Sequence, residues 1–276
     1  MAMNDPQTAL SWNNKSVEVS RRLGPDGQVI LIWRLLDLVF TTMWELNDYR
    51  QALAPFAEAE TLLQKLGPEN YPGLRAGIAS SHAHLANQQG KHQDAIAYAR
   101  EAIQIAEKLG WVEYIWEFVD IGDAYTGLGE YEQARNCYLE ALHQTDQMED
   151  LRRPFVLHHL GMVDFYQGNL KRALEYSQAG LQQAYEIPDN NNIAICLGLA
   201  ARILAKQGLP AQAAHLSGAA HALHERQGRL SWEDSALDTI LPGWEARPDR
   251  DAICQAYEEG RAMSADQAVD FALNRL

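Results

Sequence analysis

A pattern of small residues is repeated five times along the chain and strongly restricts the possible fold. A turn residue, asparagine or glycine, is followed five positions later by alanine and twelve positions later by alanine or glycine. The turn residues are Asn47, Gly90, Gly129, Gly168 and Gly208. The residues that follow are Ala52, Ala95, Ala134, Ala173 and Ala213, and then Ala59, Ala102, Ala141, Gly180 and Ala220. The first set of alanines is spaced by 43, 39, 39 and 40 residues, which is typical of stacked supersecondary units.

Each unit is predicted to be two antiparallel helices. Glycine or asparagine at the turn allows the left-handed backbone that follows a first helix, and alanine on the second helix lets the two helices approach closely. Neither helix can bury its apolar stripe alone, so neighbouring units must stack. We therefore expect an all-α fold with a polar N-terminal extension at residues 1–27, five helix pairs at 28–228 and a helical C-terminal cap at 229–276. In the cap, residues 231–234 (Ser-Trp-Glu-Asp) are expected to form a helix N-cap, and Ser264 and Gln267 have the spacing of a capping box.

The third copy resembles the tetratricopeptide repeat (TPR), whose signature is W-x2-L-G-x2-Y followed by A-x3-F. It has Phe118, Ile121, Gly122 and Tyr125, and then Ala134 and Tyr138. The fourth copy keeps Leu157, Leu160, Gly161, Gly168 and Ala173 but has Asp164 in place of the tyrosine, and the other copies share mainly the register. The resemblance implies a right-handed superhelical solenoid in which the first helix of each pair lines a concave surface.

A second resemblance involves the C-terminal part. Residues 213–223 and 257–264 are similar to the final helices of AfsR-like and MalT-like bacterial transcriptional regulators, in which an ATPase precedes a helical-repeat sensor. Only the sensor part is matched, over roughly residues 30–275, and the sequence has no G-x-x-x-x-G-K-[ST] phosphate loop. The resemblance leaves open whether this is the sensor segment of a longer chain or a stand-alone relative.

Composition excludes several classes of partner. The 276 residues carry 37 acidic and 23 basic side chains, a net charge of −14, which argues against binding of a nucleic-acid backbone or an anionic membrane surface. We expect no membrane span, because the most apolar stretch, residues 29–40, is interrupted by Arg34 and Asp37. Cys137, Cys196 and Cys254 form no CxxC motif, so a reducing, cytoplasmic compartment is predicted.

No motif in the sequence predicts catalysis. His221 and His224, three positions apart, are the histidines best spaced to share a metal, but neither a HExxH motif nor a third ligand accompanies them. No nucleophile elbow or catalytic-cysteine signature is present. We expect no catalytic residue, no metal and no cofactor. A helical-repeat enzyme with its chemistry in the groove is the alternative, which loss of turnover on substitution of His158 or Asp123 would favour.

The concave groove is the predicted binding site. Its candidate residues come from the register of the TPR resemblance and are Trp44, His84, Asn87, Trp116, Asp123, His158, Met162, Phe165, Tyr166, Arg202 and Lys206. Aromatic side chains supply apolar contact area and polar ones fix the orientation of a ligand. Arg202 and Lys206 lie one helical turn apart and are placed to meet an acidic group together. The alternative is that Trp116, Phe165 and Tyr166 only pack between units.

These features predict non-catalytic recognition of a protein, a peptide or a small inducer in the groove. The second resemblance implies the sensor or scaffold part of a bacterial signalling or transcriptional regulator, in which ligand binding shifts a conformational equilibrium. A stand-alone TPR adaptor or co-chaperone is the alternative. The sequence leaves the formation of a homodimer open.

Overall fold

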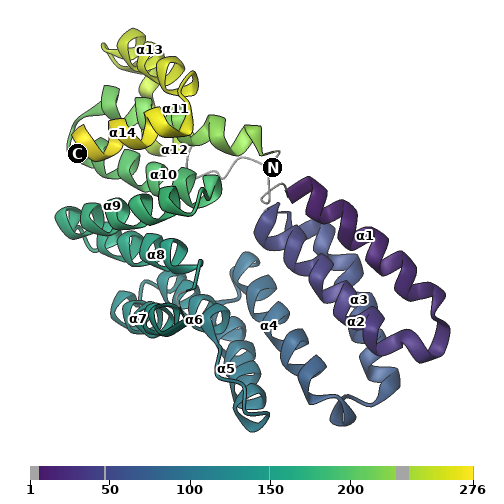
Figure 1. Cartoon of the computed structure of the whole chain (residues 1–276). Coiled ribbons are helices and arrows are strands. Elements are labelled where there is room, and N and C mark those ends of the chain that lie inside the picture. The colour runs from purple at the N-terminus through teal and green to yellow at the C-terminus, as the bar shows by residue number, and fades with distance from the viewer. Residues whose placement is uncertain (1–5, 47, 149, 228–235, 276) are drawn as a thin grey trace. The chain divides into compact units, whose positions relative to one another are not determined.

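All regular structure in the described residues, which are 6–46, 48–148, 150–227 and 236–275, is helical in the computed structural model (Figure 1). The first elements are α1 (Pro6–Arg22), η1 (Gly24–Gly27), α2 (Gln28–Phe40), η2 (Thr41–Glu45), α3 (Tyr49–Leu66), η3 (Pro68–Asn70), α4 (Pro72–Gln88), α5 (His92–Lys108) and α6 (Ile115–Gly127). They are followed by α7 (Tyr131–Met148), α8 (Arg153–Tyr166), α9 (Leu170–Glu186), α10 (Asn190–Lys206), α11 (Pro210–Arg226), α12 (Leu237–Ile240), η5 (Trp244–Ala246), α13 (Arg250–Arg261) and α14 (Ala265–Arg275). The predicted all-α class is confirmed.

Contacts divide the chain into two compact units, Met1–Gln144 (unit 1) and Thr145–Leu276 (unit 2). The boundary lies inside α7. The sequence analysis divides the chain differently, by the register of its repeats, into residues 1–27, 28–228 and 229–276. This division stays a prediction. The first segment, which the sequence predicts to be a polar extension, contains a 17-residue helix, α1, that packs against α2.

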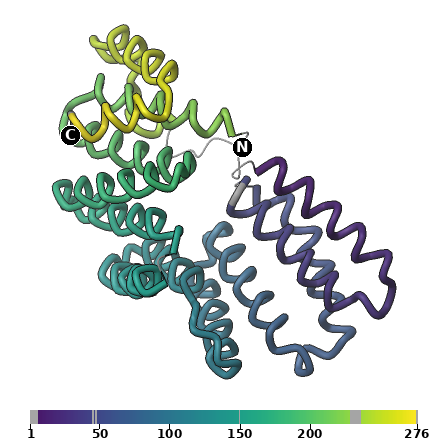
Figure 2. The backbone as a smooth tube through the Cα atoms, in the orientation of Figure 1, coloured from purple at the N-terminus to yellow at the C-terminus, as the bar shows by residue number. Residues whose placement is uncertain are grey.

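Short turns connect the paired helices (Figure 2), and the glycines in these turns have the backbone conformation that the repeat pattern predicts. Gly90, Gly129, Gly168 and Gly208 have φ angles of 71°, 75°, 80° and 79°, in the left-handed region. A Cβ atom added at any of these four positions would meet nothing within 4 Å. Glycine is therefore favoured by backbone conformation alone and not by crowding. The fifth turn residue, Asn47, lies outside the described residues.

Small residues lie where paired helices approach most closely, as predicted. Ala52, Ala95, Ala134, Ala173 and Ala213 are all fully buried. At the next small position Gly180 is the exception to alanine, and a Cβ there would come within 3.0 Å of Cys196 Sγ and 3.2 Å of the Pro154 carbonyl oxygen. Neighbouring helices therefore pack at a distance that larger side chains would not allow.

The core of unit 1 is built around α2. Its buried residues, including Ile32, Leu35 and Val39, pack with Phe56 and Leu63 of α3. The 21 residues Gly24–Trp44 are long and apolar enough by composition to cross a membrane, contrary to our expectation that no segment would be. More than half of the tested stretch is buried inside the unit, however, as in the core helix of a soluble protein.

In unit 2, the two segments of the second resemblance come together. Helix α13 packs on α11 so closely that a Cβ at Gly218 would lie 2.1 Å from the Tyr257 carbonyl oxygen, and one at Gly260 would lie 1.9 Å from that of His215. Arg261 is paired with Glu225 at 2.7 Å. The expected capping box of α14 is present: the Ser264 N–H donates to Gln267 Oε1 (2.9 Å) and the Gln267 N–H donates to Ser264 Oγ (3.2 Å). The other expected cap, at residues 231–234, lies outside the described residues.

Candidate functional site

Side chains from three successive first helices form an aromatic cluster in unit 1. The ring centroids of Trp44 and Trp116 are 4.4 Å apart, and Trp116 meets Phe40 edge-on at 5.5 Å. The ring of His84 lies 4.0 Å from that of Trp44. We call Phe40, Trp44 and Trp116, together with Trp33 and Trp111 beside Gly73 of α4, the aromatic face. Three candidates from widely separated sequence positions thus meet in space.

A π-helical turn at the end of α2 positions Trp44. This turn, η2, is supported by the Thr42 hydroxyl, which donates to the carbonyl oxygens of Leu38 and Val39 at 2.9 Å. The Asn13 side chain of α1 donates to Thr41 Oγ1 at 2.6 Å. The wider turn changes the helical register, so that Phe40 and Trp44 both contact Trp116. Sequence periodicity carries no signal for this extra residue.

Glycines on α4 make room for the other two tryptophans of the aromatic face. A Cβ at Gly73 would lie 3.4 Å from the Trp111 ring and 3.8 Å from the Trp33 ring, and one at Gly77 would lie 3.5 Å from Trp33. Trp33, Phe40 and Trp111 are 38 %, 36 % and 44 % exposed. Partly exposed aromatic side chains that lie together are typical of a surface that contacts a partner. Our sequence analysis missed Trp33, Phe40 and Trp111, although Trp33, Phe40 and Trp44 follow each other at helical spacing.

A buried polar layer lies beneath the aromatic cluster, between α4 and α6. His84 Nδ1 is 3.0 Å from Asp120 Oδ1, and Asn87 Nδ2 donates to the Asp120 carbonyl oxygen at 2.8 Å. Burial raises the pKa of Asp120, an effect that its hydrogen bond with His84 opposes. Burial also raises the pKa of Glu117. A hydrogen bond between the Ser80 side chain and this carboxylate opposes the rise. This layer fixes α4 against α6, and with it the position of Trp116 relative to His84.

The arrangement in unit 1 suits binding better than proton transfer. His84 and Asp120 are 6 % and 1 % exposed, and the Trp44 ring lies over the imidazole, so the pair is shielded from solvent. The candidate Asp123 accepts a hydrogen bond from the Tyr138 hydroxyl at 2.6 Å, which ties its carboxylate to α7. No group of three metal-ligating side chains occurs in the described part of the chain. His221 Nδ1 contacts the Tyr257 hydroxyl.

The candidates of unit 2 gather around α8 and α10. Phe165 and Met162 pack against a small core of Ala173, Leu199 and Ile203. Phe165, Arg202 and Lys206 line one cavity of about 440 Å³, together with Ala205, Thr239, Ile240, Leu241, Pro242 and Arg247. Lys206 Nζ lies 6.0 Å from the Phe165 ring centroid. The wall that α12 and the segment after it contribute to this cavity was not predicted.

The other two candidates of α8, His158 and Tyr166, are not among the residues that line this cavity. Burial lowers the pKa of His158 well below its usual value, and electrostatic interactions with His159 and Arg202 lower it further. Tyr166 is 44 % exposed and its ring meets that of Phe165 at 5.8 Å.

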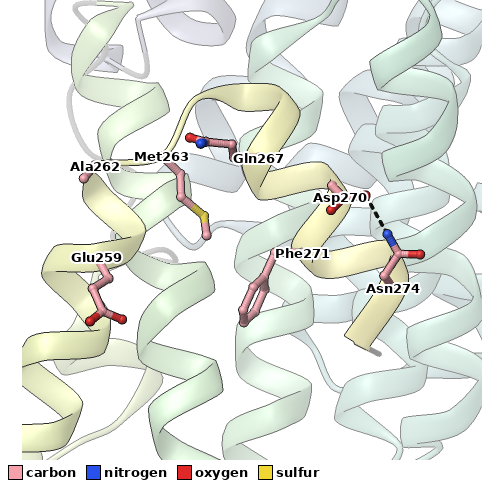
Figure 3. A pocket seen from close by; sticks show the side chains of 7 residues that line it. All are labelled: Glu259, Ala262, Met263, Gln267, Asp270, Phe271 and Asn274. Carbon is pink, nitrogen blue, oxygen red and sulfur yellow. Dashed lines mark hydrogen bonds between the residues drawn. The ribbon is translucent and has the colours of Figure 1, made fainter.

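A further cavity lies between α13 and α14, away from every candidate residue. Its volume is about 430 Å³, and its lining residues are Glu259, Ala262, Met263, Gln267, Asp270, Phe271 and Asn274 (Figure 3). Asn274 Nδ2 donates to Asp270 Oδ1 at 2.6 Å, and Phe271 stacks on His215 with 4.3 Å between ring centroids. Its polar lining is thus partly engaged in contacts that hold α14 in place.

Comparisons with known proteins agree with the helical-repeat architecture. The family model described as tetratricopeptide repeat matches residues 74–143, which cover most of α4, all of α5 and α6, and most of α7. The chain matches no curated protein sequence.

Several solved structures share the fold. The chain is similar to BtubC (BKLC) from P. vanneervenii (20 % identity, TM-score 0.57, covering 83 % of this chain and 94 % of that one). It is similar to aspartyl phosphate phosphatase F from Bacillus subtilis (16 % identity, TM-score 0.58, covering 89 % of this chain and 71 % of that one). It is also similar to NprR in complex with its cognate peptide NprX (17 % identity, TM-score 0.59, covering 99 % of this chain and 83 % of that one). The chain therefore has a TPR-like all-helical repeat fold, with a tetratricopeptide-repeat match over residues 74–143.

Proposed function

We propose that this chain is a non-catalytic recognition domain that binds an extended peptide, or an extended segment of a protein, on the aromatic face of unit 1. The observation that carries the proposal is the convergence of Phe40, Trp44 and Trp116, from two first helices, with Trp44 stacked over His84 of a third first helix. Aromatic side chains that are already in contact bind apolar groups with little loss of conformational entropy.

The geometry gives the expected ligand its character. Trp33 and Phe40 are seven residues apart on α2, about two helical turns or 10 Å, so an extended chain of three to four residues would span them. Gly73 and Gly77 of α4, which carry no side chain, lie against the rings of Trp111 and Trp33. A ligand with two apolar side chains at that separation fits best.

The finer proposal is a place in bacterial signalling or transcriptional regulation, as the sensor or scaffold part of an AfsR-like or MalT-like regulator. Support comes from the likeness of the C-terminal segments to those regulators and from the helical-repeat fold that the chain shares with NprR, which was solved with a cognate peptide. As part of the same proposal, the chain acts in the cytoplasm and does not itself contact nucleic acid.

The test is selection of 12-residue peptides from a random displayed library on the full chain, followed by affinity measurement by fluorescence polarisation. Phe40→Ala and Trp33→Ala remove side chains that are already partly exposed, so the fold should tolerate both substitutions. We expect each to weaken the selected peptides by about tenfold, the size expected for a buried aromatic contact.

Trp12→Ala is the matched control, because Trp12 is 65 % exposed on α1 of the same unit and lies outside the aromatic face. Peptides that bind the Phe40→Ala and Trp33→Ala variants as tightly as the parent chain would disprove the aromatic face as the site. A library that yields no peptide would count against peptide recognition itself.

A further inference from the structure

We propose that the aromatic face of unit 1 binds a basic side chain between the two apolar groups of its ligand, and that the carboxylate of Glu117 is the partner of this cation. The inference rests on the proposed function and deepens it, because it names the chemical class of the bound segment. The expected ligand is a basic peptide segment with flanking apolar residues.

One side of α4 places the Glu117 carboxylate. This side carries Gly73, Gly77, Ser80 and His84, at spacings of four, three and four residues. The two glycines lie against tryptophan rings of the aromatic face, and His84 lies against another of its rings, that of Trp44. Between these two ends, the Ser80 side chain forms a hydrogen bond with Glu117 of α6. The carboxylate therefore lies between the two groups of aromatic rings.

The charges around Glu117 leave room for a cation. Burial raises the pKa of this carboxyl, and the negative charges of Asp120 and Glu113 raise it further. Arg34, which follows Trp33 on α2, is already paired with Asp37 at 2.7 Å. A ligand cation beside Glu117 would offset the repulsion among these carboxylates and stabilise the ionised form.

A partly buried carboxylate among aromatic rings attracts a cation in two ways. Glu117 is partly buried, so its attraction to an opposite charge is screened less than at an exposed position. The faces of tryptophan rings attract cations as well, and Trp116 precedes Glu117 on α6. A guanidinium group stacks on such rings and binds a carboxylate through two parallel hydrogen bonds. Arginine therefore fits this position better than lysine.

The length of α4 along this side sets the spacing within the ligand. The distance from Gly77 to His84 is roughly 10 Å and that from Gly73 to His84 roughly 16 Å, at the rise of an α-helix. In an extended chain, side chains i, i+2 and i+4 point to the same side and span about 13 Å. The expected segment thus has an apolar residue, arginine two positions later and a second apolar residue two positions after that.

Two displayed libraries of 12-residue peptides test this inference on the full chain. Both have leucine or phenylalanine at positions 5 and 9 and random residues elsewhere, except that position 7 is arginine in one library and glutamine in the other. We expect the best arginine peptides to bind at least tenfold tighter than the best glutamine peptides, as measured by fluorescence polarisation. Glu117→Gln, whose amide oxygen can still accept from Ser80, should weaken the arginine peptides by at least tenfold and leave the glutamine peptides unchanged.

Glu140→Gln is the matched control, because it removes the same charge from an exposed position of α7. If it weakens the arginine peptides as much as Glu117→Gln does, the attraction comes from the net charge of the chain and the proposed pairing is wrong. Arginine peptides that bind no tighter than glutamine peptides would also overturn the pairing, whereas the aromatic face would stand if Phe40→Ala weakens both. If neither library yields a peptide that Phe40→Ala weakens, the proposed function itself fails, and this inference fails with it.

Discussion

The absence of a Cβ atom at Gly122 allows two helices to approach closely. It lies on α6 opposite Tyr138 of α7, and an added Cβ would lie 2.5–2.8 Å from three atoms of the tyrosine ring. The ring cannot move easily, because it is 1 % exposed and its hydroxyl donates to Asp123. We expect Gly122→Ala to lower the free energy of unfolding by about 2–3 kcal/mol, as measured by urea denaturation.

The Tyr138→Leu background provides the control for this prediction. If the clash with the ring is the cause, Gly122→Ala should cost clearly less in that background, and the double-mutant cycle should give a coupling energy of about 1 kcal/mol or more. Equal costs in the two backgrounds would show that the effect comes from another source.

Glu117 makes stability depend on pH. Burial raises its pKa in the folded chain above the usual value, so the folded state holds its proton more tightly than the unfolded state does. The contribution of this carboxyl to stability is therefore most favourable at low pH, and it falls as pH rises from near 4.5 through the raised pKa. Glu117→Gln removes this titration while its amide oxygen can still accept from Ser80. We expect the variant to gain stability relative to the parent as pH rises from 5 to 8.

Urea unfolding at several pH values measures the difference. Glu140→Gln, on the exposed surface of α7, is the matched control. A gap between parent and Glu117→Gln that stays constant over this pH range would contradict the burial of an ionising carboxyl at this position.

These two residues differ in how far the sequence predicts them. Gly122 belongs to a local signature, in which the spacing to Tyr125 and Ala134 already indicates a close helix contact. The burial of Glu117 and Asp120 depends on α4, more than thirty residues earlier in the chain, and helical periodicity does not indicate which partner each carboxyl meets. Acidic residues in such a sequence are interpreted by default as solvated.

At the scale of helices, α11 and α13 approach so closely that their backbones nearly touch. A Cβ at Gly260 would lie 1.9 Å from the His215 carbonyl oxygen and 2.8 Å from its carbonyl carbon. Backbone atoms cannot rotate away as a side chain can, so the two helices must separate. We expect Gly260→Ala to destabilise unit 2 by about 3 kcal/mol or more and to increase amide hydrogen exchange across α13 and α14.

Helix propensity alone predicts that Gly260→Ala stabilises α13, whereas the close contact with α11 predicts that it destabilises unit 2. Alanine favours a helix over glycine by about 1 kcal/mol, so Gly260→Ala would stabilise α13 if contacts did not matter. Ala252→Gly, at an exposed position of the same helix, should cost only that propensity. If Gly260→Ala exchanges no faster than the parent chain, the close approach of α11 and α13 does not exist in solution.

The sequence predicts some elements well and others poorly for physical reasons. The turns at Gly90, Gly129, Gly168 and Gly208 and the capping box of α14 depend on interactions within a few residues, so the local sequence contains their cause. The π-helical turn η2, and the wall that Thr239, Ile240 and Leu241 add to the cavity of unit 2, depend on tertiary contacts. The repeat register gave Trp44 and Trp116 as groove candidates but not Phe40, whose contact with Trp116 is seen only in the folded chain.

For the whole molecule, the two compact units imply that a core defect should act mainly within its own unit. Leu197 of α10 is fully buried in unit 2. We expect Leu197→Ala to cost about 2–5 kcal/mol and to increase hydrogen exchange in α8, α9, α10 and α11 more than in α2 and α3. Leu151→Ala, at a leucine that is 67 % exposed, should change neither unit. An equal increase in both units would indicate that the chain unfolds as one cooperative body.

The turn glycines have a consequence for how chains of this type change in length. Each of the four described turns has the same left-handed backbone, is surrounded by open space and is followed at the same distance by a buried alanine. A duplication or deletion that begins at one turn and ends at the next would add or remove a whole helix pair and restore an equivalent junction. Such chains can therefore lengthen or shorten by recombination in steps of about forty residues, with each intermediate gene still encoding a stackable protein.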